Sequence, residues 1–222
     1  MLADFPYDLS IVIDNFHLFI PAAWMTMKIT AAAILVGMVF GLIAAFMKIS
    51  KYWPLRLVAN IYITIIRGTP ILLQLFIIYY GLAEVVALDA FPSAVIAFGA
   101  HNGAYIAEIF RGAIQSIEKG QMEAARSLGM THFQAMRRVI LPQAFKRAVP
   151  PLGNQFIIAL KDSSLASTIA VRELLLQSRQ MGASAFSYME FLIIAGAYYL
   201  ILTSIFSVIV NRIEKRLSVS DR

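Results

Sequence analysis

Long apolar segments dominate the pattern of this chain and predict a membrane protein. A helix needs about 17 to 25 residues to cross a hydrocarbon core of about 30 Å. Five segments reach that length, and polar or charged residues separate each one from the next. The predicted spans are residues 20–47, 55–82, 91–110, 148–171 and 191–210. We therefore predict an all-α, polytopic membrane protein with five transmembrane helices.

The segment before the first span, residues 1–19, contains acidic residues but no Lys or Arg. A secretory signal peptide begins with a basic region, so we expect this segment to stay on the mature protein. Six apolar residues fall on one side of a helical wheel, with Asp14 on the other side, which favours a short helix at the outer membrane interface: Leu9, Val12, Ile13, Phe16, Phe19 and Ile20. The same pattern also fits the beginning of a tilted first span, and both interpretations stay open.

The composition supports a membrane location and narrows the chemistry. Hydrophobic residues make up 59% of the chain and charged residues 14%, which excludes an ordinary soluble domain and a disordered chain. The sequence has no cysteine, which removes disulfides, thiolate metal sites and cysteine nucleophiles. Because no repeat or low-complexity linker divides the sequence, we predict that residues 1–222 form a single integral-membrane domain.

The chain has a net charge of +6, and its basic residues are distributed unevenly between the two sides of the membrane. If successive spans cross in opposite directions, 14 of the 19 Lys and Arg residues fall on one side of the membrane. Only Arg172 and Arg179 fall on the other side, and the remaining basic residues lie within spans. The positive-inside rule then places the N-terminus outside and the C-terminus in the cytoplasm. Orientation accounts for the basicity, so we expect no nucleic-acid partner.

The main soluble segment is the predicted cytoplasmic loop 111–147. Residues 123–129 predict a short helix that ends at Gly129, because glycine readily adopts the left-handed conformation that terminates helices. A second helix is predicted over residues 132–140 and should end before Pro142. The result is a compact helical hairpin, through which any cytosolic partner would act. By composition alone it could equally be a plain connection between two spans.

Seven residues of this loop have a characteristic spacing. They are Glu123, Ala124, Ala125, Gly129, Val139, Leu141 and Pro142. The spacing resembles the signature loop of permease subunits of binding-protein-dependent ATP-binding cassette importers, with Val139 where the family usually has Ile. Three further motifs resemble the polar amino acid branch of that family, and the resemblance extends over residues 24–216. These motifs are Arg67-Gly68-Thr69-Pro70 with Gln74, residues 104–109 with Arg111-Gly112, and residues 160–165.

The resemblance implies a type I importer permease that works as a pair, either with a second copy of itself or with a paralogue, in the lipid of the cell membrane. It also implies a cytoplasmic ATPase with a groove for the helix around Glu123, and an extracytoplasmic amino-acid-binding protein. The chain has no GxxxxGK[ST] motif. We therefore expect ATP and Mg²⁺ to be bound by the partner ATPase. The chain itself should need no cofactor and catalyse no covalent reaction.

Two other classes of function compete with this interpretation. In an ion-gradient-driven secondary amino-acid transporter, Glu108 and Asp162 could carry protons. The signature loop disfavours that class, because a secondary carrier has no ATPase to dock. A membrane-embedded hydrolase would need a base beside Ser163 or Ser164, and no histidine is a convincing candidate.

Polar residues inside the predicted spans are the candidate ligands, because an ionisable group at bilayer depth costs at least about 2.5 to 3.5 kcal/mol. Pro70 should bend the second span, as helices at substrate sites of transporters often bend. Gln74 lies one turn beyond it, and we favour this amide over Arg67, for which a structural ion pair is the alternative. Lys28 is expected to extend to the outer interface and to have no role in a site.

The third and fourth spans supply the other candidates. His101, Tyr105 and Glu108 follow an i, i+4, i+7 spacing and share a helix face, which predicts either a cavity lining or hydrogen bonds between helices. The polar run 161–164 interrupts the fourth span, roughly 20 Å beyond Pro150 along a helix. Either carboxylate, Glu108 or Asp162, could bind a substrate ammonium. The predicted substrate-binding residues are Thr69, Gln74, Asn102, Tyr105, Glu108, Asp162 and Ser163.

Overall fold

The computed structural model describes residues 7–82 and 86–219, and each regular element in these ranges is helical, which confirms the all-α prediction. The α-helices are α1 (Leu9–Asn15), α2 (Ile20–Ile49), α3 (Trp53–Gly68), α4 (Ile71–Phe76), α5 (Ala90–Gln115), α6 (Lys119–Ser127), α7 (His132–Ala135), α8 (Leu141–Asp162), α9 (Leu174–Ala185) and α10 (Tyr188–Val219). Shorter 3-10 turns cover Phe16–Phe19 and Ser163–Ile169, and wider π turns cover Ile77–Gly81 and Met136–Ile140.

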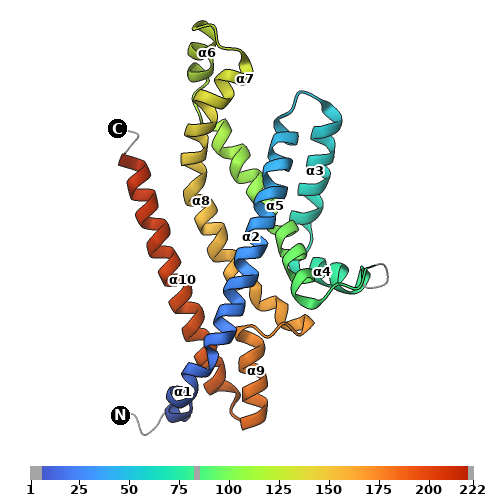
Figure 1. Ribbon diagram of the computed structural model, residues 1–222, viewed down its shortest axis with the longest axis vertical. Coiled ribbons are helices and arrows are strands. Elements are labelled where there is room, and N and C mark those ends of the chain that lie inside the picture. Colours follow the sequence, from blue (N-terminus) through green and yellow to red (C-terminus); the bar gives the residue numbers. More distant parts are fainter. Residues whose placement is uncertain (1–6, 83–85, 220–222) are drawn as a thin grey trace.

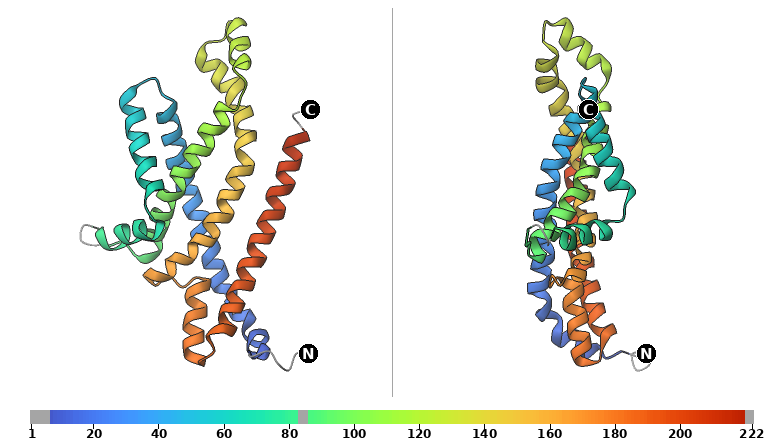
Figure 2. Two further views of the ribbon diagram at one scale, coloured as in Figure 1. Left: turned by 180° about the vertical axis from the view of Figure 1, so that it is seen from behind. Right: turned by 90° about the vertical axis from the view of Figure 1, so that its right-hand side faces the viewer.

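The helices form an elongated bundle. α2, α5, α8 and α10 run along its length, with the α6–α7 hairpin at one end and α1 and α9 at the other (Figure 1). Seen from the side, the bundle is a narrow slab (Figure 2).

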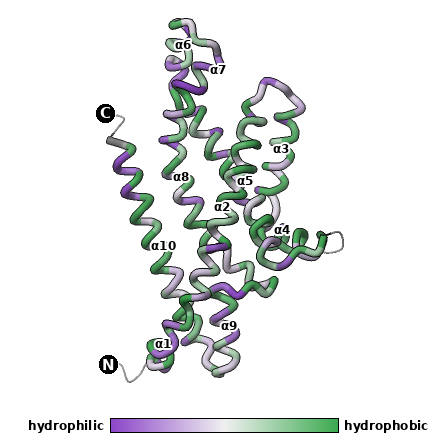
Figure 3. Tube along the Cα trace, in the orientation of Figure 1, coloured by the Kyte–Doolittle hydropathy of each residue, from purple (hydrophilic) through white to green (hydrophobic). Residues whose placement is uncertain are grey.

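All five predicted spans are helical, but they differ in character. Two stretches, Leu9–Ile49 and Tyr188–Leu217, are long and apolar enough to cross a membrane by themselves. α3 and the segment from α4 to Gly81 qualify as a third span only as a pair, and that pair is bent by 108°. α5 and α8, with 26 and 22 residues, are long enough, but polar residues interrupt their apolar surface (Figure 3).

The N-terminal helix is continuous with the first span. The predicted short helix is present as α1, and the 3-10 turn Phe16–Phe19 joins it to α2 without a break. Asp8 caps α1 by accepting a hydrogen bond from the backbone N–H of Ser10 at 2.9 Å. Its pKa is lowered, because the hydroxyl and the backbone N–H of Ser10 both hydrogen-bond to the charged carboxylate. The first six residues of the predicted outer segment lie outside the described residues.

Pro70 produces the predicted bend in the second span. α3 ends at Gly68, and Thr69 and Pro70 have extended backbones with ψ angles of 149° and 136°. A proline favours an extended conformation in the residue before it and cannot donate the next helical hydrogen bond. The chain therefore leaves the axis of α3 before α4 begins.

One prediction for the loop 111–147 is wrong. The second loop helix does not end before Pro142, because the helical path from His132 continues through the π turn Met136–Ile140 into α8. Pro142 lies in the first turn of α8, where a missing N–H is tolerated. The wide turn ahead of it gives the proline ring room.

The predicted interruption of the fourth span is confirmed. α8 ends at Asp162, the 3-10 turn Ser163–Ile169 follows, and Ala170 has a left-handed backbone with φ 63°.

Glycines bring α2 and α5 into close contact. A Cβ atom on Gly41 of α2 would lie 2.5 Å from Ile106, and one on Gly99 of α5 would lie 2.5 Å from Val36. A Cβ on Gly103 would lie 2.8 Å from Phe40 and 2.7 Å from the Tyr62 hydroxyl. Residues 37 and 41, like residues 99 and 103, form a Gly-x-x-x-Gly pair, which allows close helix packing in membranes. The two Gly-x-x-x-Gly pairs are thus a packing signal that the sequence already contains.

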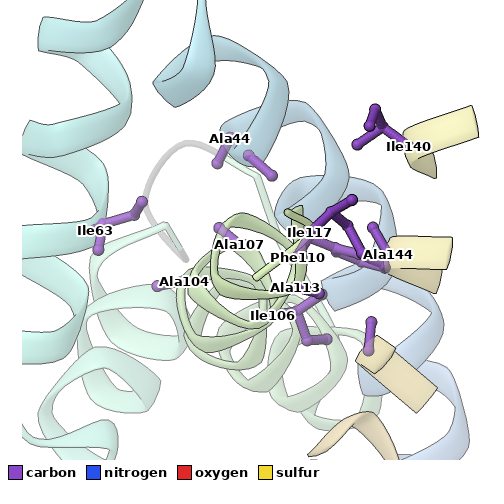
Figure 4. Packing of buried hydrophobic residues seen from close by; sticks show 12 residues of the cluster. Ala44, Ile63, Ala104, Ile106, Ala107, Phe110, Ala113, Ile117, Ile140 and Ala144 are labelled. Atoms are coloured by element: carbon purple, nitrogen blue, oxygen red, sulfur yellow. The ribbon is translucent and has the colours of Figure 1, made fainter. Parts of the chain in front are cut away.

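Small side chains extend this packing along α5. In Figure 4, α5 lies at the centre of a buried cluster, with α2 on one side and the segment around Ile140 and Ala144 on another. Ala104, Ile106 and Ala107 of α5 are completely buried. α5 is thus the central helix of this part of the bundle, and its neighbours contact it from several directions.

We expect Gly103→Ala to destabilise the fold. The new methyl group would overlap Phe40 and Tyr62, and overpacking of this kind costs about 1 to 3 kcal/mol. Gly112→Ala is the matched control, because nothing lies within 4 Å of a Cβ at that position of the same helix. Thermal unfolding of both purified variants measures the difference. Equal melting temperatures would contradict the close contact.

Candidate functional site

Gln74 holds the bend between α3 and α4. Its side chain is buried, and its Nε2 lies within hydrogen-bonding distance of three oxygens of α3 and the bend: the Ile66 carbonyl at 2.7 Å, the Thr69 hydroxyl at 2.8 Å and the Thr69 carbonyl at 3.1 Å. Its Oε1 lies 3.0 Å from Nδ1 of His101 on α5. The favoured ligand of the sequence analysis is thus occupied within the protein, where it ties α4 both to the end of α3 and to α5.

The Tyr105 ring lies next to these residues and contacts both Arg67 and His101. The guanidinium of Arg67 lies 5.2 Å from the centre of the Tyr105 ring, and the His101 ring lies 5.1 Å from the same ring. Thr69 donates its hydroxyl hydrogen to the Ile65 carbonyl at 2.8 Å. The structure therefore brings Thr69, Gln74 and Tyr105 into one neighbourhood. Among the described residues, none hydrogen-bonds to the Tyr105 hydroxyl.

Asn102 makes a hydrogen bond between helices. The residue is completely buried, its Nδ2 donates to the Phe98 carbonyl at 2.8 Å, and its Oδ1 accepts from Gln155 of α8 at 2.8 Å. Gln155 is itself buried and was not among the predicted residues. The polar face of α5 was predicted either to line a cavity or to form hydrogen bonds between helices. Asn102 forms a hydrogen bond between helices.

Glu108 lies apart from the other predicted ligands. One of its carboxylate oxygens pairs with Lys48 of α2, and the other accepts from Nε and Nη2 of Arg111 at 2.9 and 2.7 Å. Both oxygens are therefore occupied by cations within the chain, and Glu108 joins α2 to α5 as a structural ion pair.

Asp162 presents the opposite case. It is the last residue of α8 and half-buried, and no side chain in the described part of the chain hydrogen-bonds or ion-pairs with its carboxylate. The adjacent Lys161 is exposed. Ser163 is completely buried, and its hydroxyl donates to the Leu160 carbonyl at 2.7 Å. Within the polar run 161–164, Asp162 is thus a half-buried carboxylate with unused capacity for hydrogen bonds.

The sequence analysis missed Glu173, which is completely buried. Its carboxylate accepts from the backbone N–H groups of Leu175 and Leu176 at 2.9 and 2.8 Å and from the Tyr199 hydroxyl at 2.7 Å. It therefore caps α9 and connects that helix to α10. An acidic residue directly before an apolar helical run is a recognisable capping signal, and this signal could have found Glu173.

The predicted turn at Gly129 is confirmed in detail. Gly129 has φ +81°, its N–H donates to the Arg126 carbonyl at 3.0 Å, and the N–H of Met130 donates to the Ala125 carbonyl at 3.2 Å. These two bonds form the Schellman motif that ends helices at glycine.

The hairpin directs apolar side chains outward. Leu128 is 81% and Phe133 72% exposed, whereas Ala125 is buried. Glu123, Ala124 and Pro142 are exposed, and Leu141 is half-buried. The signature residues from Glu123 to Gly129 therefore lie on a projecting element with a partly apolar surface, which is typical of a protein contact, whereas Leu141 and Pro142 lie in the first turn of α8.

Residues 37–219 match the family described as binding-protein-dependent transport system inner membrane component. The chain belongs to this family. It is 46% identical to the L-cystine transport system permease protein TcyB of Bacillus subtilis, over 87% of this chain and 84% of that protein. It is 40% identical to the glutamine transport system permease protein GlnP of Escherichia coli K12, over 96% and 99% of the two chains. A crystal structure of an amino acid ABC transporter with histidines superposes with a TM-score of 0.90, at 43% identity and with 96% and 100% coverage.

Membership of this permease family decides several expectations. The chain is a multi-pass inner membrane permease subunit of an importer, and ATP hydrolysis belongs to a partner subunit. A binding protein is the other partner that the family requires. The alternative of an ion-gradient-driven secondary transporter is therefore wrong, and the expected importer permease fold is confirmed.

We expect Gln74→Ala to destabilise this permease by about 1 to 3 kcal/mol, because it removes the partner of the buried His101 ring and of the half-buried Ile66 carbonyl. Gln143→Ala serves as control, since within the described part of the chain its side chain bonds only to the Val139 carbonyl of its own helical run. Melting temperatures of the two purified variants provide the comparison. If Gln74→Ala melts no lower than Gln143→Ala, Gln74 does not hold the bend.

Proposed function

We propose that this permease passes a polar amino acid into the cytoplasm and that Asp162 receives the ammonium group of the substrate. The observation that carries this proposal is the half-buried carboxylate of Asp162, for which the described residues supply no hydrogen-bond donor. A carboxylate removed from water is stabilised by a positively charged hydrogen-bond donor, and every amino acid offers one.

The relatives support the substrate class. The names of two of them specify L-cystine and glutamine, and both are polar amino acids. The position of Asp162 where α8 gives way to a 3-10 turn also fits, because discontinuous helices often form the substrate sites of transporters.

Among the other predicted substrate ligands, Tyr105 alone has a side-chain polar group without a hydrogen-bond partner in the described structure. Tyr105 keeps a free hydroxyl within the described structure and is our second candidate. Gln74, Asn102, Glu108 and Ser163 already have partners in the chain. Thr69 is likewise occupied, as donor to Ile65 and as contact of Gln74.

The orientation and pairing of the permease belong to the same proposal. The excess of Lys and Arg at the end with the α6–α7 hairpin supports a cytoplasmic position for that end, with the N-terminus outside. The narrow slab seen in Figure 2 supports a translocation path formed between two such chains, because a single slab has little interior to enclose one. The second chain would be an identical copy or a paralogue.

The hairpin is the proposed contact with the ATPase. Leu128 would enter an apolar groove of the partner, and Glu123 would lie at the rim. Because Gly129 fixes the angle between α6 and the segment that leads into α8, movement of the hairpin would reach the transmembrane helices as a rigid displacement.

We expect Asp162→Asn to weaken substrate binding about tenfold or more, since a hydrogen bond between charged groups contributes about 1.5 to 3 kcal/mol. Glu108→Gln should instead lower the stability of the chain and leave affinity unchanged, because Glu108 pairs with Lys48 and Arg111. Binding of radiolabelled amino acids to the purified, assembled permease separates these effects.

Lys28→Gln is the control for Asp162→Asn. Lys28 is exposed and lies 5.5 Å from the Trp24 ring, so we expect binding like that of the wild type. The role of Asp162 would be disproved by wild-type affinity in correctly assembled Asp162→Asn permease, and the family membership would not be affected.

A second prediction concerns coupling. Gly129→Val should impair uptake and retention of the ATPase, because a β-branched residue is strained at φ +81° and would change the angle of the hairpin. Gly120→Val is the control, since Gly120 has open space around its Cβ position and no positive φ. Uptake and ATPase co-purification are measured together. Normal values of both for Gly129→Val would refute the docking role of the hairpin.

A further inference from the structure

A large basic cavity lies at the end of α2 nearest the α6–α7 hairpin. Its volume is about 1110 Å³, and it is bordered by the α2–α3 turn, the end of α5 and the helical run that begins at α7. Two lysines and two arginines line it, Lys48, Lys51, Arg111 and Arg137, together with His132. No Asp or Glu lines it within the described ranges.

The charges around this cavity are not balanced. The Glu108 carboxylate pairs with both Lys48 and Arg111, so a single negative charge compensates only one of these two positive charges. Lys51 and Arg137 are exposed, and neither has an ion pair in the described part of the chain. The cavity therefore has a surplus of positive charge and is suited to an anionic group.

An apolar groove continues from the basic cavity. The groove has a volume of about 340 Å³ and lies between α2, α5 and α8. The two spaces share Phe46, Ile114, Arg137 and Leu141, so they are contiguous. Apart from Arg137, the side chains that line the groove are apolar. A ligand that fills both spaces must have an anionic end and a hydrocarbon end.

Aromatic residues mark the depth of the cavity in the membrane. Tyr52 borders it and is 74% exposed, and the adjacent Trp53 is 66% exposed. Exposed Tyr and Trp at the end of a span are typical of the headgroup region of a bilayer. In the orientation proposed above this is the cytoplasmic leaflet, whose anionic lipids attract basic residues near the membrane.

We propose that this cavity binds an anionic phospholipid. The phosphate lies near Lys51 and Arg137, and an acyl chain enters the groove beside Phe46 and Leu141. Such a lipid contacts both the α2–α3 turn and the helical run that carries the hairpin, so it stabilises one position of the hairpin relative to α2. An acidic protein segment fits the cavity less well, because it has no hydrocarbon chain for the groove.

The test measures binding of dioleoylphosphatidylglycerol to the purified importer complex by native mass spectrometry. The double variant Lys51→Gln/Arg137→Gln should bind this lipid roughly 30-fold more weakly, because each basic residue near a membrane surface contributes about 1 kcal/mol, or about fivefold. Glycerophosphoglycerol, which has the headgroup but no acyl chains, should not compete with the lipid. Dioleoylphosphatidylcholine, which has no net charge, should bind weakly to both proteins.

The matched control is Lys119→Gln/Arg138→Gln. It removes two positive charges from the same end of the molecule, and Arg138 is the neighbour of Arg137, but neither residue lines the cavity. We expect wild-type lipid affinity in this variant. An equal loss of lipid affinity in both double variants would show that the lipid responds to the general positive charge of the surface, and it would overturn the proposal.

Unchanged lipid affinity in Lys51→Gln/Arg137→Gln would also overturn it. If that variant keeps its lipid affinity and loses the ATPase, the basic cavity belongs instead to the contact with an acidic surface of the partner. Amino-acid uptake is not measured, so the result is independent of the substrate proposed above.

Discussion

Glycines at the contact between α2 and α5 set the position of α5, which is the helix that α2, α4 and α8 all contact through polar pairs. Gly41 and Gly99 leave no space for even a methyl group at the positions where the two helices meet. In a lipid environment the hydrophobic effect does not drive helices together, so close van der Waals packing must supply most of the attraction. Small residues make that packing possible, because they let the helix backbones approach.

The polar contacts of α5 depend on this spacing. From its several faces, α5 directs His101 to Gln74 of α4, Asn102 to Gln155 of α8 and Glu108 to Lys48 of α2. Hydrogen bonds and ion pairs weaken steeply with distance and angle, and a buried group that loses its partner is costly. Glycine packing therefore sets the position of α5, and the polar pairs then fix the direction of each neighbouring helix.

Much of the fold followed from local features of the sequence. The apolar segments predicted the helices, Pro70 predicted the bend, and Gly129 predicted the end of α6, because each effect depends on a few adjacent residues. The π turn before Pro142 was not predicted. It depends on how the helix absorbs the proline, and sequence rules for proline describe only the commoner outcome, in which the helix ends.

The candidate site was harder to predict, because it depends on partners distant in the sequence. Glu108 and Lys48 are 60 residues apart, and Asn102 and Gln155 are 53 apart. A helical wheel identifies the polar face of α5, but it does not show that this face is divided among three different helices. Glu173 was not predicted for a related reason. It lies just beyond the predicted end of the fourth span at residue 171, where a charged residue would be in water and would need no partner.

The polar groups of this permease differ in whether the chain itself supplies their partners. Gln74, Asn102, Glu108 and Glu173 are occupied within the chain, and each of them joins two or more helices. By contrast, Asp162 has no hydrogen-bond donor in the described structure, and Lys51 and Arg137 have no ion pair there. A charge at membrane depth is expensive, so the half-buried carboxylate of Asp162 is stabilised when a cationic group from outside the chain completes it, whereas the exposed Lys51 and Arg137 are hydrated and attract anions. In an importer whose work depends on a substrate, an ATPase and the bilayer, such groups are expected at the surfaces where these meet the chain.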